Sequence, residues 1–233
     1  MLERVQFRGL PIVMAALSLG ACAPAPRPDS GSVLRPSAAA VSAGQPYEIV
    51  ESDVTVRVYR DGPLARLGHN HVIASTGVTG RVVLAESVSR STLELSLPLD
   101  SLTVDEPARR AAAGSDFPDN VTEADREGTR RNMLGTALLD AATFPAVHLA
   151  SVAVAEREGI LYVTARVDIT GHVREIVVPV TLETQGPTLV ARGEFTVTHA
   201  ELGLVPFSVA MGALRVRDDL QVAYRLVARK ANT

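Results

Sequence analysis

The 233-residue sequence contains one cysteine, no tryptophan and only 4% aromatic residues. A single cysteine excludes a disulfide framework and any cysteine-rich zinc or iron–sulfur site. Lysine and arginine (23) nearly balance aspartate and glutamate (26), and a formal charge of −3 argues against a nucleic-acid-binding domain. Because 46% of the residues are hydrophobic, the bulk of the chain is not intrinsically disordered. The composition therefore predicts one aliphatic-rich globular domain with extensions.

Sequence motifs of the common enzyme classes are also missing. The chain has no G-x-S-x-G nucleophile elbow, no P-loop, no G-x-G-x-x-G fingerprint and no H-E-x-x-H zinc motif. Its serine and aspartate residues do not stand in a recognisable nucleophile context. We therefore expect a protein that is not an enzyme.

The first 22 residues have the features of a bacterial export signal. Arg4 and Arg8 precede an apolar run at 10–19, which is too short to span a bilayer as a helix. The sequence LGAC at 19–22 then resembles a bacterial lipobox, and the resemblance implies cleavage before Cys22 and lipid attachment to that cysteine. The alternative is an ordinary signal peptide followed by a free thiol.

The chain divides into four parts by composition. Residues 1–21 are the predicted signal peptide, and residues 22–46, which include five prolines and many alanines and serines, form a predicted tether. Residues 47–229 form the predicted folded domain, and residues 230–233 a short tail. We expect the lipid on Cys22 and this tether to hold the domain near a membrane surface.

From Tyr47 onward, apolar and polar residues alternate as they do in half-buried strands. Turn signals at 61–63, 158–159, 185–187 and 218–219 separate the runs. We count eight or nine strands, and nearly all have one apolar face, so the sheet must turn that face inward as a sandwich or a closed barrel. The clearest apolar stripes run over 54–58, 93–99, 161–169, 195–197 and 220–226.

The segment 100–140 has no convincing strand pattern. Thr122 and Asp125 have the spacing of an N-cap and its partner, which predicts a helix over 123–140. Apolar residues then recur at helical spacing from Met133 to Leu138, so this helix is expected to pack on the barrel as a lid or a plug. The pair Arg109-Arg110 is predicted to lie on the surface of the preceding loop.

Four segments, in order, resemble the YceI-like family. LDAATFP at 139–145 followed by LAS is similar to the family's FD…YP…F.S stretch, and DITG at 168–171 is similar to its LTIHG turn. FTVTHAELG at 195–203 resembles its F.INRSDFG strand, and VRDDL at 216–220 begins the closing strand. Residues depart from the family pattern at Leu149, Thr170 and His199.

The resemblance implies an all-β fold, namely an extended antiparallel lipocalin-like β-barrel of about eight strands with one helical insertion near 123–140. It also implies an exported protein that binds a polyisoprenoid, such as a prenyl quinone or polyprenyl phosphate, in a long apolar cavity. An eight-stranded barrel is wide enough to hold one small ligand. We expect no cofactor apart from such a bound isoprenoid lipid.

Histidines form the sharpest polar pattern in the chain. If the segment His69-Asn70-His71 is a strand, His69 and His71 project from the same face and could reach one metal ion or one polar headgroup. A metal site needs a third ligand, and none lies nearby in sequence. Hydrogen-bonded histidines at a barrel rim are the structural alternative.

Other candidates for a ligand's headgroup are Arg130, Arg131, Asn132 and His199. Guanidinium groups suit phosphate or pyrophosphate, although Arg130 and Arg131 could equally form a solvated helix face. No residue is assigned a catalytic role.

The leading hypothesis is a lipid-anchored periplasmic protein that sequesters a long apolar ligand and faces the periplasm from the outer membrane. Its expected partners are that hydrophobic molecule and the membrane, with no nucleic acid. The sequence leaves the oligomeric state open, a dimer included. Two alternatives also stay open: a solid barrel that acts through its outer surface, and a metal-dependent redox accessory using His69 and His71. Leucine and valine stripes fill a core as readily as they line a pocket.

Overall fold

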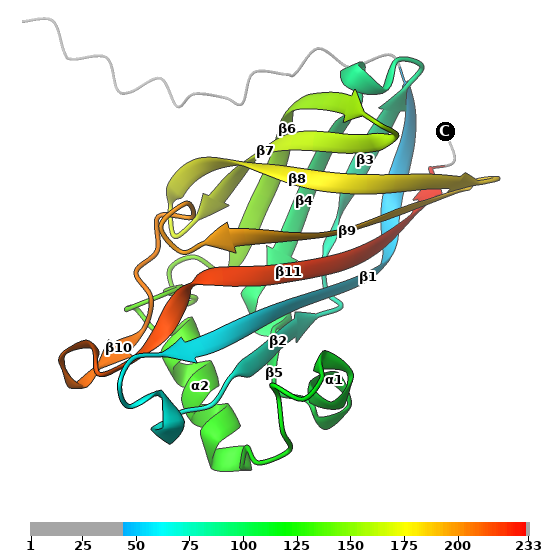
Figure 1. Cartoon of the computed structure of the whole chain (residues 1–233). Helices are drawn as coiled ribbons and strands as arrows, with labels where there is room; N and C mark the ends of the chain where they lie inside the picture. Colours follow the sequence, from blue (N-terminus) through cyan, green and yellow to red (C-terminus); the bar gives the residue numbers. More distant parts are fainter. Residues whose placement is uncertain (1–43, 232–233) are drawn as a thin grey trace, which may run out of the picture. The chain divides into compact units, whose positions relative to one another are not determined.

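The computed structural model describes residues 44–231, so the predicted signal peptide, Cys22 and most of the predicted tether lie outside the described residues. Eight antiparallel strands close into a barrel in the order β1-β3-β4-β6-β7-β8-β9-β11, because β11 pairs with β1 (Figure 1). These strands are β1 (Gly44–Asp61), β3 (Thr79–Ala85), β4 (Thr92–Pro98), β6 (Ala146–Arg157), β7 (Ile160–Ile169), β8 (His172–Gln185), β9 (Thr188–Thr198) and β11 (Leu214–Lys230). The predicted lipocalin-like barrel of eight strands is confirmed.

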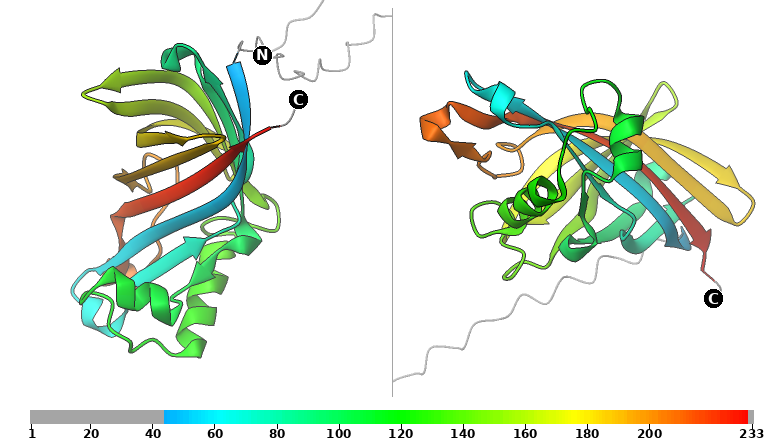
Figure 2. Two further views of the ribbon diagram at one scale, coloured as in Figure 1. Left: turned by 90° about the vertical axis from the view of Figure 1, so that its right-hand side faces the viewer. Right: turned by 90° about the horizontal axis from the view of Figure 1, so that it is seen from below.

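Shorter elements surround one end of the barrel, and one 3-10 helix, at residues 88–90, lies at the other end (Figure 2). Three short strands raise the number of strands in residues 44–231 to eleven, more than the eight or nine predicted. They are β2 (His71–Ser75), β5 (Thr103–Val104) and β10 (Ser208–Val209), and the helices are η1 (Ala65–Leu67), η2 (Val88–Arg90), η3 (Leu99–Ser101), η4 (Ala210–Gly212), α1 (Pro107–Ala113) and α2 (Glu123–Leu134). No helix of this part of the chain is long and apolar enough to cross a membrane.

The turn predicted at Asp218-Asp219 is wrong. These residues lie inside β11, where Val58 pairs with Leu220 but Arg60 pairs with Val216. The extra residues form a β-bulge, which uses the same polar residues as a turn without reversing the chain. By contrast, Glu158-Gly159 does form the β6–β7 turn, with positive φ at both residues as a two-residue hairpin requires.

Helix α2 begins where the sequence predicts and ends earlier. Thr122 Oγ1 accepts a hydrogen bond from the Asp125 N–H at 3.2 Å, and the Asp125 carboxylate accepts one from the Thr122 N–H at 2.9 Å. The helix ends at Leu134 and not near 140, because Gly135 is extended (ψ 169°) and its carbonyl accepts the N–H groups of the next turn. Met133, Leu134 and Leu138 still pack on the barrel core, so the predicted plug is present.

The segment 100–140 holds two elements that the sequence analysis missed. Strand β5 pairs only Thr103 and Val104 with β2, which is too short to show an alternating pattern. Helix α1 has Pro107 at its first turn and ends before Gly114, which has a φ of +98°. Its alanine- and arginine-rich sequence carries no apolar stripe.

Candidate functional site

The barrel contains a cavity of about 240 Å³. The apolar stripes of β1, β4 and β7 run from this cavity into the packed end of the barrel. In β7, for example, Leu161, Val163 and Ala165 line the cavity, whereas Val167 and Ile169 join the buried core cluster with residues near α2. Most cavity-lining valines and leucines are only half-buried, although their side chains point inward. The barrel is therefore hollow beside the plug. Its aliphatic and aromatic lining consists of Ile49, Val54, Val78, Val82, Leu84, Val88, Leu93, Leu95, Leu97, Leu149, Val154, Leu161, Val163, Ala165, Ile176, Val178, Val180, Leu182, Leu189, Ala191, Phe195, Val222, Tyr224, Leu226 and Ala228.

Three of the four side chains with a polar group in the cavity wall, those of Ser91, Ser151 and Tyr224 but not Thr92, are hydrogen-bonded within residues 44–231 of the protein. Ser151 Oγ accepts a hydrogen bond from the Leu93 N–H at 2.9 Å, and Ser91 Oγ accepts one from the Ala85 N–H at 3.1 Å. Tyr224 Oη donates to a backbone carbonyl, and burial raises the pKa of this phenol, which keeps it neutral. The cavity is therefore suited to hydrocarbon and supplies little recognition of a charged group.

One seam of the barrel, between β8 and β9, is paired over only part of its length. Thr181–Gln185 pair with Thr188–Arg192. Residues 172–180 and 193–198 continue as strands but have no register partner across this seam. The barrel wall is thus closed at one end of the seam and is not hydrogen-bonded as a ladder at the other.

Three residues mark the place where the β8–β9 pairing stops. Pro179 has no N–H to donate to a ladder, and its carbonyl oxygen accepts a hydrogen bond from Tyr224 Oη at 2.7 Å. Gly193 leaves space for this contact, because a Cβ there would lie 2.8 Å from the tyrosine oxygen. The cavity-lining residues Ile176 and Phe195 stand on the two strands beyond this point.

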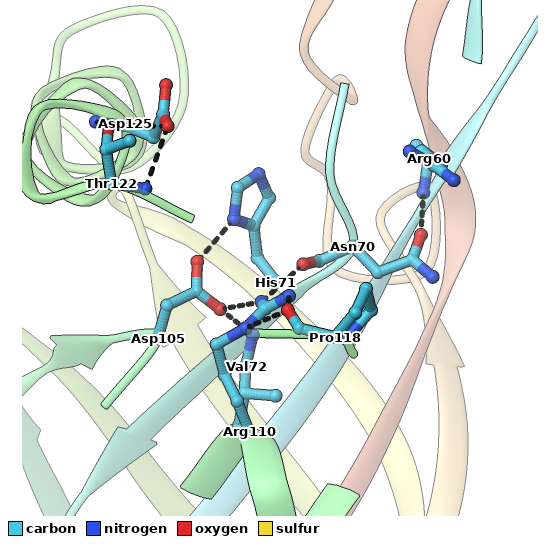
Figure 3. Close-up of polar contacts among 9 residues, drawn as sticks. All are labelled: Arg60, Asn70, His71, Val72, Asp105, Arg110, Pro118, Thr122 and Asp125. Carbon is cyan, nitrogen blue, oxygen red and sulfur yellow. Dashed lines mark hydrogen bonds and ion pairs between the residues drawn. The ribbon is translucent and has the colours of Figure 1, made fainter. Parts of the chain in front are cut away.

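A second polar site lies at the plugged end, where a buried carboxylate joins three elements (Figure 3). Asp105 is 0% exposed and accepts hydrogen bonds from His71 Nδ1 at 2.6 Å, the Val72 N–H at 2.8 Å and the Arg110 guanidinium at 2.6 Å. Arg110 is 1% exposed and also donates to the carbonyl oxygens of Asn70 (2.7 Å) and Pro118 (2.7 Å). This network ties β2, α1 and the loop before α2 together.

The charges of this network support one another. Burial by itself would raise the pKa of Asp105, but the hydrogen bonds from His71, the Val72 N–H and Arg110 outweigh it and hold that pKa below its usual range. The prediction that Arg110 lies on a loop surface is wrong, although its neighbour Arg109 does pair with Asp53 at a partly exposed position, 2.5 Å apart. Because charged residues are rarely buried, the sequence contains no pattern that would predict the burial of Asp105 or Arg110.

The two histidines of the predicted pair lie close together but not on one strand. His69 precedes β2 and His71 begins it, and their ring centroids are 6.3 Å apart. The Nδ1 atom of His71 is occupied by Asp105. Within residues 44–231, no group of three or more histidine, cysteine, aspartate or glutamate side chains is arranged to hold a metal ion.

The other predicted headgroup residues also lie outside the cavity lining. Arg130 donates to the backbone carbonyl oxygens of Leu102 and Asp100, which attaches α2 to the barrel. Arg131 and Asn132 are exposed on α2. His199 is buried, and its Nδ1 lies 2.9 Å from the carbonyl oxygen of Asp218. The structure thus brings His69 and His71 together but does not gather the six residues into one site, and their role toward a headgroup stays a prediction.

The fold and the cavity define a class of lipocalin-like barrels that enclose an apolar space. Residues 47–228 match the YceI-like domain, and the chain belongs to that family. Among solved structures, Burkholderia cenocepacia BcnA is 17% identical, with a TM-score of 0.56, over 76% of this chain and 95% of that one. A polyisoprenoid-binding domain from Saccharophagus degradans, implicated in plant cell wall breakdown, is 12% identical, with a TM-score of 0.54, over 79% of this chain and 98% of that one. No curated protein matches the chain.

Proposed function

We propose that this protein binds the hydrocarbon chain of a polyisoprenoid in its barrel, as a carrier or reservoir and without catalysis. The observation that carries the proposal is the hollow aliphatic cavity, in which Ser91, Ser151 and Tyr224 already have hydrogen-bond partners within the protein. Membership of the YceI-like family and the polyisoprenoid-binding neighbour support the choice of ligand.

The energy of binding comes from burial of the chain. Each CH₂ group moved from water into such a cavity contributes about 0.8 kcal/mol. A cavity of 240 Å³ lies below the volume of roughly 300–1,000 Å³ that is usual for drug-sized molecules. A cavity of this volume encloses only part of a long prenyl chain, but its almost wholly aliphatic lining suits a flexible chain better than a flat ring system, so we expect selection by the chain more than by the headgroup.

Native mass spectrometry with organic extraction tests this proposal. Residues 44–231, which contain all eight barrel strands and the core, would be produced in a bacterial periplasm. A prenyl lipid at near one per chain is expected. An empty protein whose cavity also takes up no added prenyl alcohol would overturn the proposal and favour a module that acts through its outer surface.

A matched pair of variants locates the ligand. Ala191 lines the cavity, so Ala191→Phe fills space that the ligand needs and is expected to abolish co-purification of the lipid. Ala155 is exposed on β6, so Ala155→Phe adds the same ring outside and should leave binding unchanged. Equal binding by the two variants would place the ligand somewhere other than the cavity.

We further propose that the protein is exported and anchored to the periplasmic face of the outer membrane through lipid on Cys22. The lipobox-like sequence at 19–22 supports this proposal. Cys22→Ala is expected to release the protein into the soluble periplasmic fraction without unfolding it. A Cys22→Ala protein that stays wholly with the membrane would refute the anchor.

A further inference from the structure

The exposed large apolar side chains of residues 44–231 are not scattered evenly. Five of the ten lie on two neighbouring loops, and the others are spread along the barrel strands. We call these two loops, residues 64–67 and 205–213, the β10 tip. Its exposed apolar side chains are Leu67, Val205, Phe207, Val209 and Met211.

Backbone contacts hold the two loops of the β10 tip together. The Leu64 N–H donates to the carbonyl oxygen of Ala213 at 2.8 Å, and β10 pairs with the start of β11. The Val216 N–H also donates to the carbonyl oxygen of Phe207 at 2.9 Å. The tip is therefore an ordered projection, and it extends beyond the ends of β1 and β11 (Figure 1).

The residue at the end of the tip is placed against its conformational preference. Met211 is 106% exposed, and both it and Ala210 adopt positive φ, at 54° and 51°. Glycine or asparagine would take this backbone at a lower free energy. The stability of the fold therefore does not explain a methionine at this position. A contact between its side chain and an apolar medium outside the protein would explain it.

Arginines surround the apolar residues of the β10 tip. Arg215 pairs with Asp61 (2.6 Å) and Arg217 with Asp219 (2.8 Å), so these two charges are compensated. Arg60 and Arg66 form no ion pair within residues 44–231, and Arg66 is exposed on η1 itself. Arg60 donates to the backbone carbonyl of Gly68. Asp218, between Arg217 and Asp219, also forms no ion pair in this part of the chain, so two uncompensated arginines and one uncompensated aspartate leave the rim of the tip with a net charge of +1.

We propose that the β10 tip is a membrane-docking element, which inserts its apolar side chains into the headgroup region of an anionic bilayer. A stable protein–protein interface takes roughly 20–30 residues a side, far more than this tip offers. A convex projection with a few bulky apolar side chains and neighbouring arginines suits an interfacial bilayer contact. This inference is independent of the cavity ligand and of Cys22.

The absence of tryptophan from the sequence allows a direct test. The Met211→Trp variant of residues 44–231 carries a single reporter, and its emission is recorded with vesicles of phosphatidylglycerol and phosphatidylcholine. We expect a blue shift and quenching by brominated acyl chains. Val177→Trp, at an exposed valine of β8, is the matched control and should show neither.

Two further variants separate the apolar and the charged contributions. Met211→Glu, measured by vesicle flotation, should weaken partitioning by about tenfold or more, since an exposed residue is changed without loss of packing. Arg66→Gln should weaken binding to anionic vesicles and leave binding to phosphatidylcholine vesicles unchanged.

Three results would overturn the proposal. The first is a Met211→Trp emission that no vesicle shifts, together with unchanged flotation of Met211→Glu. The second is an equal shift of Met211→Trp and Val177→Trp, which indicates adsorption without a specific tip. The third is a blue shift without vesicles accompanied by a doubled mass in light scattering, which makes the tip a contact between two copies of the chain.

Discussion

Removal of the buried charge of Asp105 is expected to destabilise the plugged end of the barrel severely. Asp105→Asn keeps the shape of the side chain, and asparagine tolerates the positive φ of 53° at this position. The amide replaces a carboxylate that accepts three hydrogen bonds, and it leaves the Arg110 guanidinium, 1% exposed, without a counter-charge. Breaking a buried ion pair in this way costs about 3–5 kcal/mol of folding free energy.

The neighbouring pair provides the control for this prediction. Arg109 and Arg110 are adjacent on α1, and each holds an aspartate, but the Arg109–Asp53 pair is partly exposed to water. Asp53→Asn should therefore cost about 1 kcal/mol or less.

Urea denaturation followed by circular dichroism measures both variants, and a loss of 3–5 kcal/mol corresponds to a fall in melting temperature of roughly 6–20 °C. Equal losses for Asp105→Asn and Asp53→Asn would show that burial of the network does not determine its contribution, and would refute the reasoning.

Other contacts lead to smaller effects. Thr122→Ala removes the side-chain cap of α2 and should lower the free energy of unfolding by about 1 kcal/mol in urea denaturation, with Thr122→Ser restoring it. Tyr224→Phe leaves the Pro179 carbonyl without its donor; we expect a loss of about 1 kcal/mol and faster amide exchange over 172–180, and unchanged exchange would contradict the assignment. Because the folded-state pKa of Asp105 is depressed, its contribution to stability is complete above roughly pH 4 and is lost as the pH falls through that folded-state pKa. Asp105→Asn should therefore flatten the acid limb of the pH–stability curve, and an unaltered acid limb would exclude Asp105 as its source.

The sequence predicts the barrel because its determinants are local. Alternation such as Leu161-Val163-Ala165 identifies the inward face of a strand, and the Thr122/Asp125 spacing identifies the start of α2. The sequence places the end of α2 too late, because apolar residues keep helical spacing past Gly135 although the helical backbone ends at Leu134.

Features that depend on contacts between distant segments were beyond prediction. Asp105 and Arg110 are buried only because β2, α1 and the loop at Pro118 converge on them, and nothing in their own sequence distinguishes them from surface charges. In the same way, a leucine stripe does not reveal whether the barrel is hollow, since the free volume depends on how all eight strands are spaced.

The incomplete pairing of β8 with β9 has a mechanical consequence. β11 meets β1 along almost its whole length, whereas β8 meets β9 through five residue pairs at one end. The barrel wall is therefore expected to be less stiff along the unpaired part of the β8–β9 seam than along the β1–β11 seam. Bending is expected to open the wall first along this unpaired part of the seam, beside the cavity-lining residues Ile176 and Phe195. The β1–β11 side of the barrel is then the rigid side. On the more compliant side, the hydroxyl of Tyr224 holds β8 through one hydrogen bond to the carbonyl oxygen of Pro179.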